Sequence, residues 1–575
     1  MEKKRLRFGV ICDSINVYGW QLNCLKKMLE MDDVEASLMI LVKNKQLQKE
    51  DEKKTLRYFN PAKTTSLTSL VNNIKIIGCD LVRIKTGEDH LSKEDLEKIY
   101  GYDLDFILNI SSINVSGDIL TLPRFGVWVF QHGSDLPHYI WCLENNEPVT
   151  FAALHKLSNQ NKHIILKKGC FSTIKDSYRE NREHITSVIS NWPALVCRDI
   201  LNDNTAYMKE CEVPTSPSNF VDLTFKNMGK FFVKLLKNKG QKIFSKLFSY
   251  EYWNIGIVPK PIHEFLNDSN LNINWLVQKK DLYYADPFAY QDEEGLHILM
   301  EELDYRVVKG FISGVNVKQK TAMDTASFNQ AVMKFPCHMS YPFILEHNKH
   351  IYCIPETSEA KEASIYKLNK SNNEWKKVKT LLEDFHAVDS TIVKYGEYWW
   401  LFCTKSFSTV QSHNNELHIF YADDLFGEWQ PHVLNPVKID IRSSRPAGTP
   451  FIHEGKLFRP AQDCSKTYGG RIVLNKIKTL TIFQFEEEPV CYLEPQNNSL
   501  YPDGVHTISS AGGITILDGK RFDYSLFHFF RKLYKYRPVN LEKVKSDQFK
   551  TGEIGIQKRL LRSQIQEQIK QVKQH

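Results

Sequence analysis

The chain has 575 residues and a formal net charge of +7; 42% of its residues are hydrophobic and 25% are charged. This length exceeds what one hydrophobic core usually supports, so it predicts two or three domains. The composition is ordinary for a soluble globular protein, and the mild positive charge matters only where it is concentrated.

Four features bear on the compartment and on metals. The start of the chain leads into a strand rather than an apolar signal core, and no run of about 18 apolar residues predicts a transmembrane helix. The twelve cysteines contain no CxxC pair, which favours reduced thiols over a disulfide framework. His386, His413 and His418 lack metal-site spacing. We therefore expect a cytoplasmic protein without a metal.

Residues 1–205 predict an α/β domain. Apolar runs at residues 6–12, 34–42 and 105–110 predict buried strands, and residues 20–31 have helical spacing. Strands that alternate with helices indicate an open α/β sheet, in which ligands bind at the carboxyl ends of the strands.

The most specific stretch of this domain is residues 122–135, LPRFGVWVFQHGSD. Together with residues 164–173, IILKKGCFST, it resembles the core of the formyltransferase fold, as in methionyl-tRNA and sugar N-formyltransferases. The resemblance implies that fold, a catalytic His132 and 10-formyltetrahydrofolate as cofactor. The family's asparagine position falls on Val129 or Phe130, and its aspartate position falls within residues 168–173, which hold no carboxylate. Asp135 and His138 offer a different polar site near His132, or else belong to a solvated loop.

Residues 206–250 predict a basic amphipathic linker. Lysines recur at helical spacing over residues 226–237, and phenylalanines and leucines supply an apolar side up to residue 248. Such a helix suits an anionic membrane surface. The alternative that we favour is that the apolar side packs between two large domains and leaves the lysines in water.

Residues 251–525 predict a five-bladed β-propeller. One pattern, an apolar strand, a polar turn and a second strand, occurs five times at intervals of about 50–60 residues. The equivalent positions in the five copies are Pro287, Pro342, Thr391, Pro450 and Thr507. Each copy buries its apolar faces only by stacking on its neighbours around an axis. The alternative is an irregular β-sandwich.

The first residue of each inner strand points toward the central funnel of a propeller, where ligands bind. These residues are Asp286, Tyr341, Asp389, Arg445 and His506. Carboxylates from different blades resemble the sites of family 43 glycoside hydrolases, which are five-bladed. The resemblance implies Asp286 as the base, Asp389 as the residue that tunes pKa, and Glu356, or second Glu301, as the acid. Inverting hydrolysis needs two carboxyl groups roughly 6.5–9.5 Å apart.

A closer resemblance covers nearly all of this half. It rests on the phrases YADPF (284–288), IPETS (354–358), AVDST (387–391), NNELH (414–418), RSSRPAG (442–448) and RPAQDCS (459–465). They look like the N-terminal domain of glucosamine inositolphosphorylceramide transferases, which bacterial relatives join to a formyltransferase-like domain. Carboxylate, guanidinium and amide groups around aromatic rings suit sugar hydroxyls or phosphate. We therefore expect Tyr341, Arg445, Gln462, Asp463 and His506 to bind substrate, or alternatively to tie the blades together.

Residues 526–575 predict a basic helical tail, with aromatic residues interleaved with lysine and arginine up to residue 535. No nucleic-acid module is present, so we expect no nucleic-acid partner. Two basic amphipathic segments instead favour peripheral contact with the inner membrane face.

These features support two readings of function. The first is a carbohydrate-active transferase of bacterial surface-polysaccharide biosynthesis, which acts on or binds a nucleotide- or lipid-linked sugar by acyl, formyl or glycosyl transfer. The second is a non-catalytic carbohydrate-binding protein with a degenerate formyltransferase domain. Glycoside hydrolysis is a weaker third. The sequence leaves the sugar, the donor and the oligomeric state open.

Overall fold

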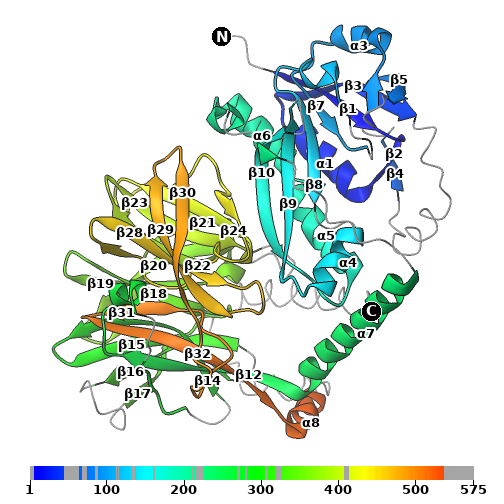
Figure 1. Cartoon of the computed structure of the whole chain (residues 1–575). Coiled ribbons are helices and arrows are strands. Elements are labelled where there is room, and N and C mark those ends of the chain that lie inside the picture. The colour runs from blue at the N-terminus through cyan, green and yellow to red at the C-terminus, as the bar shows by residue number, and fades with distance from the viewer. Residues whose placement is uncertain are drawn as a thin grey trace, which may run out of the picture.

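The computed structural model describes residues 5–43, 64–67, 74–83, 89–111, 113, 115–132, 136–158, 162–209, 213–214, 225–268, 272–278, 282–304, 309–317, 327–406 and 414–535. They form two bodies, an α/β body and a β-propeller, joined by a long helix (Figure 1). None of the helices in these ranges is long and apolar enough to cross a lipid bilayer.

The α/β body is built on one nine-stranded sheet with the order β11-β10-β9-β8-β7-β1-β3-β5-β6. Its strands are β1 (Leu6–Cys12), β3 (Val34–Lys43), β5 (Lys75–Arg83), β6 (Asp89–Leu91), β7 (Phe106–Asn109), β8 (Val127–His132), β9 (Val149–Leu157), β10 (Lys162–Ser172) and β11 (Val213–Pro214). The central strands β5, β3, β1, β7 and β8 are parallel, whereas β9, β10 and β11 extend the sheet in antiparallel pairs.

Helices cover this sheet: α1 (Gly19–Leu29), α3 (Lys93–Tyr100), α4 (Leu136–Glu144), α5 (Tyr178–Ile189) and α6 (Trp192–Leu201). A small two-stranded sheet pairs β2 (Asn16–Tyr18) with β4 (Thr64–Ser66), and short 3-10 turns lie at Asp118–Leu120 and Ala206–Lys209. Successive side chains of β1 point to opposite faces of the sheet, so Phe8 and Val10 pack into one core and Ile11 packs into the other.

Five antiparallel sheets form the propeller and confirm the five-bladed prediction. Blade 1 holds β14 (Leu282–Asp292), β15 (Gly295–Asp304), β16 (Lys309–Val317) and β17 (Ser327–Met333); blade 2 holds β18 (Ser340–His347), β19 (His350–Glu356), β20 (Glu362–Asn369) and β21 (Glu374–Glu383). Blade 3 holds β22 (Ala387–Tyr395), β23 (Tyr398–Lys405), β24 (Glu416–Ala422), β25 (Gln430–Pro431) and β26 (Lys438–Ile439); blade 4 holds β27 (Phe451–His453), β28 (Lys456–Asp463), β29 (Arg471–Leu480) and β30 (Phe485–Leu493). Two short 3-10 turns, Ile262–Leu266 and Ser358–Ala360, lie between strands.

Blade 5 is assembled from both ends of the propeller sequence. Its order is β13-β12-β32-β31, in which β12 (Ser249–Val258) and β13 (Asn274–Trp275) precede blade 1, whereas β31 (Ile508–Ala511) and β32 (Ile514–Tyr524) follow blade 4. The pairing of β12 with β32 runs from Ser249 opposite Tyr524 to Val258 opposite Thr515. This long pairing closes the ring, and it was not visible in the repeat itself.

The repeat positions need one correction. The inner and second strands of the first three blades pair with the same irregularity, which falls between Ala285 and Phe288, between Ser340 and Phe343, and between Val388 and Thr391. Thr391 therefore matches Phe288 and Phe343, and the residue equivalent to Pro287 and Pro342 is Ser390. The bulge adds a residue that sequence spacing alone cannot place.

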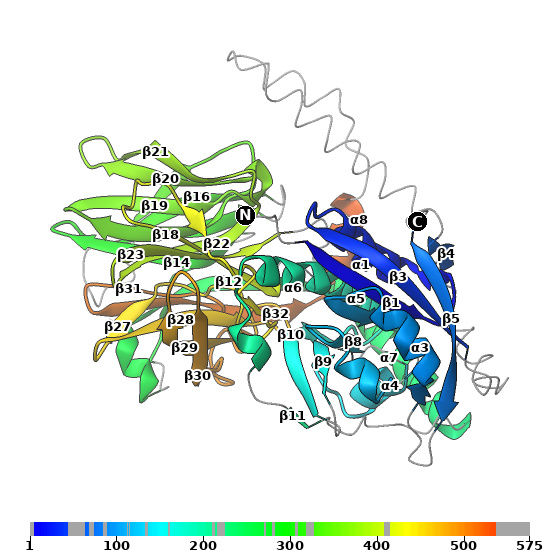
Figure 2. The same ribbon diagram turned by 90° about the horizontal axis from the view of Figure 1, so that it is seen from above.

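Helix α7 (Phe225–Phe248) runs along the outside of the molecule and leads directly into β12, and α8 (Leu526–Lys535) follows β32 (Figures 1 and 2). Phe231 of α7 is buried against Tyr139 and Ile140 of α4. We expected the apolar side of this helix to pack between the two domains. That prediction is only half correct, because Val233 and Leu236 are each 69% exposed.

The two bodies also touch directly. The Ile441 amide donates to the Cys170 carbonyl over 3.0 Å, and the Arg442 guanidinium lies 3.2 Å from the Cys170 sulfur. From α6, Arg198 Nη1 donates to the Asn435 carbonyl over 2.9 Å. Strand β10 of the α/β sheet therefore rests against blade 3 and the segment that follows it.

Candidate active site at the centre of the propeller

Backbone strain marks the three inner-strand positions of blades 1 to 3. Asp286, Tyr341 and Asp389 have φ values of +52°, +44° and +54°. Such values are uncommon for residues other than glycine, and they persist where the surrounding structure over-determines them. Each of these residues sits inside the bulge of its strand pair, so the bulge sets the direction of its side chain.

Asp389 is fully buried and anchors one half of the site. Arg445 approaches it with two nitrogens, Nε 2.5 Å from Oδ2 and Nη2 3.2 Å from Oδ1, and Gln462 Nε2 donates to Oδ2 over 3.0 Å. The Asp389 amide donates to Glu356 Oε2 over 3.2 Å. Side chains of blades 2, 3 and 4 are thereby joined around one carboxylate.

Asp286 anchors the other half. Its Oδ1 accepts from the Thr507 hydroxyl over 2.7 Å and lies 3.4 Å from His506 Nε2. His506 Nδ1 lies 2.6 Å from Asp518 Oδ2, and the same oxygen of Asp518 accepts the Asp286 amide over 3.1 Å. The His506 ring packs against Trp253 of the closing strand, with ring centroids 4.1 Å apart. Blades 1 and 5 therefore meet at a carboxylate–imidazole–carboxylate arrangement.

Glu301 belongs to the same centre. It is 5% exposed, and its Oε1 lies 3.4 Å from the Tyr283 hydroxyl and 3.4 Å from His338 Nε2. Glu301 and Glu356 occupy the same place in their blades, because Glu301 pairs with Ala285 and Glu356 pairs with Ser340. Glu356 is less buried, and its Oε1 accepts from the Ser358 hydroxyl over 2.9 Å.

These carboxyl groups repel one another in a buried centre. Burial raises the pKa of Asp286 to about 6, although His506 opposes the shift. Burial raises the pKa of Asp389 to about 7 against the lowering effect of Arg445. Burial, with Asp286 and Glu356 adding to it, raises the pKa of Glu301 well above its usual value. The carboxyl groups of this centre therefore bind their protons more tightly than exposed carboxyl groups do.

Burial and the neighbouring carboxylates have opposite effects on the pKa of His506. Burial alone lowers the pKa of a histidine, but the neighbouring Asp518 and Asp286 outweigh burial and raise the pKa of His506 above its usual value. The two carboxylates therefore favour the protonated form of the imidazole beside Asp286.

Tyr341 and Asp463 have contacts that differ from the predicted substrate-binding role. Tyr341 is fully buried, and its hydroxyl lies 3.1 Å from Thr391 Oγ1 and accepts the Gly448 amide over 2.6 Å. Asp463 accepts from Arg471 Nε over 2.9 Å and from the Ser465 amide over 3.0 Å. The Tyr341 hydroxyl thereby links blade 2 to blade 3 and to the segment that leads into blade 4, whereas the contacts of Asp463 stay within blade 4.

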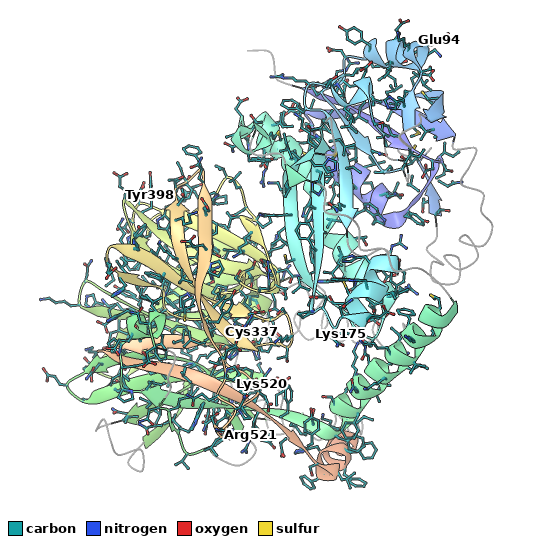
Figure 3. All side chains as sticks on the ribbon, viewed as in Figure 1. Glu94, Lys175, Cys337, Tyr398, Lys520 and Arg521 are labelled. Atoms are coloured by element: carbon teal, nitrogen blue, oxygen red, sulfur yellow. The ribbon has the colours of Figure 1, made fainter. Side chains whose placement is uncertain are left out.

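Arg445 and Tyr468 lie where the centre meets solvent. Tyr468 is 37% exposed, and the Arg445 guanidinium carbon lies 5.1 Å from its ring centroid. Lys520 of β32 (labelled in Figure 3) is fully buried. Its ammonium group donates to the Thr467 hydroxyl over 3.2 Å and to the Tyr468 carbonyl. The loop that carries Tyr468 is therefore held over the central cluster.

In the α/β body, His132 ends β8, at the carboxyl end of a parallel strand, but the position of its side chain lies outside the described residues, as does Asp135. His138 stacks on Trp141, with ring centroids 5.6 Å apart. The predicted cluster of His132, Asp135 and His138 therefore stays a prediction.

One group of side chains has the geometry of a cation site. Asp286, His506 and Asp518 each offer one ligand atom, and these atoms lie within 4.8 Å of one another. The amides of His506 and Thr507 already donate to Asp518 Oδ1 over 2.9 and 3.0 Å, so the charge of this carboxylate is compensated within the protein. The donor set fits hydrogen bonding to a ligand better than coordination of an ion.

The sequence analysis did not place Asp518 in the candidate site, and it ranked Glu301 second to Glu356. A signal was present: the second strand of a copy ends in a carboxylate at Glu301, Glu356, Asp463 and Asp518. Only the pairing register shows that three of these four face the centre, while Asp463 faces Arg471.

Fold and site together define a class: a five-bladed β-propeller with buried carboxyl groups from several blades at its centre. Residues 277–500 match the family described as "Glucosamine inositolphosphorylceramide transferase 1, N-terminal". Proteins named glucosamine inositolphosphorylceramide transferase 1 from Oryza sativa subsp. japonica and from Arabidopsis thaliana are 35% and 30% identical over 210 and 258 residues. These matches cover 36% and 43% of this chain, and only 28% and 33% of the relatives.

Two solved structures are similar at low scores. An α-L-arabinofuranosidase from Podospora anserina has a TM-score of 0.31 and 11% identity, over 40% of this chain and 78% of the other. A glycinamide ribonucleotide transformylase from Symbiobacterium toebii has a TM-score of 0.25 and 12% identity, over 35% of this chain and 89% of the other.

Proposed function

We propose that this chain is a carbohydrate-active transferase of surface-glycan assembly, and that the propeller centre binds the sugar and supplies acid–base chemistry for glycosyl transfer. The supporting observation is that Asp286 and Glu301 share one buried centre, in which the pKa of Asp286 is raised to about 6 and that of Glu301 well above its usual value. Two carboxyl groups in different protonation states at neutral pH are what transfer between two oxygen atoms requires.

The roles follow from the surroundings of each group. Asp286, with a pKa of about 6, is mostly ionised at neutral pH and takes the proton of an acceptor hydroxyl as that oxygen attacks the anomeric carbon. Glu301 keeps its proton and gives it to the departing oxygen as the old glycosidic bond breaks. Asp389, paired with Arg445, and His506, held between Asp286 and Asp518, position the sugar by hydrogen bonds.

The names of the relatives suggest which substrates to test first. Those proteins are named for glucosamine and for inositolphosphorylceramide, so we propose an amino-sugar donor and an inositol phosphate headgroup as the first substrates to test. We further propose that the α/β domain is of the formyltransferase type, supported by residues 122–135 and by the position of His132 at the end of β8.

The deciding experiment measures binding and turnover separately. Purified protein is screened by calorimetry against a panel of nucleotide sugars and 10-formyltetrahydrofolate, and nucleotide release is followed with an inositol phosphate lipid in detergent. Asp286→Asn and Glu301→Gln should retain binding within about threefold but lose turnover by roughly 100-fold or more, as expected for acid–base groups. Asp463→Asn is the matched control outside the centre. His132→Ala tests whether the α/β domain contributes to binding or turnover.

A second candidate function, carbohydrate binding without catalysis, is favoured by the completeness of the network around Asp389. Its carboxylate is fully buried and held by Arg445 and Gln462, as in a structural ion pair. Sugar binding without nucleotide release in the wild type would establish this function and overturn the transferase proposal. The absence of any sugar binding would overturn both.

A further inference from the structure

Helix α7 has two apolar sides, and the residues that the structure describes cover only one of them. Met228, Phe231 and Leu235 form an inward side that packs against α4. Since successive helix residues turn by about 100°, Val233 lies nearly opposite this inward side, and Leu236 and Ile243 lie at about a right angle to it. Val233 and Leu236 are each 69% exposed and Ile243 is 51% exposed, so the outward side is uncovered by any described residue.

A second helix continues this surface. Phe248 at the end of α7 stacks on Phe529 of α8, with centroids 5.2 Å apart and planes at 18°. Lys532 of α8 donates to the Lys246 and Ser249 carbonyls over 2.6 and 2.5 Å. Figure 1 shows both helices at the lower edge of the molecule, with α8 beside the end of α7. The two helices therefore present one fixed surface.

We call this surface the α7–α8 face. Its exposed apolar side chains are Phe232, Val233, Leu236, Ile243 and Phe244 of α7, Tyr524 of β32, and Leu526, Phe527 and Phe530 of α8. Exposed apolar surface of this extent, rimmed by charge, marks an interaction site.

The charge around the apolar stripe is positive on both sides. By helical spacing Lys230 and Lys237 flank it on one side, and Lys239 and Lys246 on the other. Among the described acidic residues near α7, Asp176 and Glu180 lie 2.7 and 3.8 Å from the Lys242 ammonium group, which neutralises part of their charge. The stripe with its lysines has the pattern of a helix that lies in a bilayer interface.

A groove beside the lysines provides a place for an anionic headgroup. It has a volume of about 590 Å³ and is lined by Asn146, Gly229, Lys230, Val233, Lys234, Lys237, Asn238 and Gln241. Asn238 fixes α7 to the α/β body by donating to the Lys175 carbonyl over 2.8 Å, at the end of that body nearest α7, where Figure 3 labels Lys175. Ammonium and amide donors at the edge of an apolar stripe suit a lipid phosphate.

We propose that the α7–α8 face docks on the surface of an anionic lipid bilayer. Charge complementarity selects this occupant over the chain's own tail, since residues 536–575 carry nine Lys and Arg against four Asp and Glu. A second copy of the same positive face is disfavoured for the same reason. The inference does not depend on the proposed sugar chemistry, because docking requires no residue of the propeller centre.

The test is vesicle co-sedimentation of the full chain without any sugar ligand. Vesicles of phosphatidylcholine alone are compared with vesicles that also contain phosphatidylserine, at low and high salt. The wild type should bind the anionic vesicles preferentially, and binding should weaken as salt screens the lysines. Lys230→Glu combined with Lys237→Glu should lower the partition coefficient by about tenfold or more. Leu236→Ser combined with Phe527→Ser should lower it by about tenfold as well.

Matched controls lie on the propeller. Phe483→Ser removes an aromatic side chain that is 59% exposed, and Lys376→Glu reverses an exposed lysine, and both should bind as the wild type does. Circular dichroism and thermal melting confirm that each variant is folded. Equal binding to neutral and anionic vesicles, or unchanged binding by the face variants, overturns the proposal. The proposal is also overturned if the wild type does not bind vesicles while its α7–α8 face is protected from hydrogen exchange, because the tail or a second copy then covers this face.

Discussion

The chemistry of the centre is set at the level of single residues by what burial does to neighbouring carboxyl groups. Asp286 and Asp389 are 4% and 0% exposed, and the pKa of each is raised from 3.8 to about 6 and about 7. A carboxyl group that binds its proton more tightly in the folded protein stabilises the fold fully below the unfolded pKa. That stabilisation is lost as pH rises through the folded pKa. The centre should therefore be more stable at pH 5 than at pH 8.

Asp286→Asn tests this dependence. Because the amide does not titrate, the variant should gain free energy of unfolding relative to the wild type as pH rises from 5 to 8, by roughly 1–2 kcal/mol. Urea denaturation at a series of pH values measures the difference. Parallel pH curves for the two proteins would show that Asp286 is not protonated near pH 6.

At the level of elements, the joints between blades depend on close backbone approach. Gly448 has a φ of +125° and pairs with Ile508 of blade 5. A Cβ atom at this position would lie 1.7 Å from the Ile508 carbonyl oxygen. Blade 4 can meet blade 5 here only because no side chain intervenes.

Gly448→Ala should therefore cost at least about 3 kcal/mol of unfolding free energy, because both the clash and the backbone conformation oppose it. Gly455→Ala is the matched control, since Gly455 also has a positive φ of +72° but a Cβ there would meet nothing within 4 Å. It should cost only about 1 kcal/mol. Chemical denaturation followed by tryptophan fluorescence compares them, and equal losses would count against the close-approach argument.

At the level of the whole molecule, the α/β body and the propeller share a small apolar contact. Ile439 of β26 is 8% exposed and packs within the same core as residues of the α/β sheet. A Cβ atom at Gly169 of β10 would lie 3.0 Å from the Ile439 side chain, so the two bodies approach closely here.

Ile439→Asp places an unpaired charge in this contact and should separate the unfolding of the two bodies. Scanning calorimetry should then show two transitions, the lower one shifted down by several degrees. Ile452→Asp is the control, because Ile452 lies on blade 4 and is 55% exposed. A single transition in the Ile439 variant would mean that the bodies are coupled elsewhere.

The sequence by itself determined the local features of this protein. Strand–turn–strand periodicity predicted five blades, and apolar runs predicted the strand at residues 6–12, because both patterns depend only on neighbours along the chain. The same local patterning predicted the helix at α7, whose observed bounds are Phe225–Phe248.

Only the tertiary structure decided which residues meet. The closing strand β12 lies outside the repeat, and its Trp253 packs on His506 from the far end of the propeller sequence. Glu301 and Asp518 joined the centre while Asp463 did not, because bulges and pairing register aim carboxylates of similar sequence context in different directions. The raised pKa values and the uncovered side of α7 likewise depend on long-range packing, which no sequence window contains.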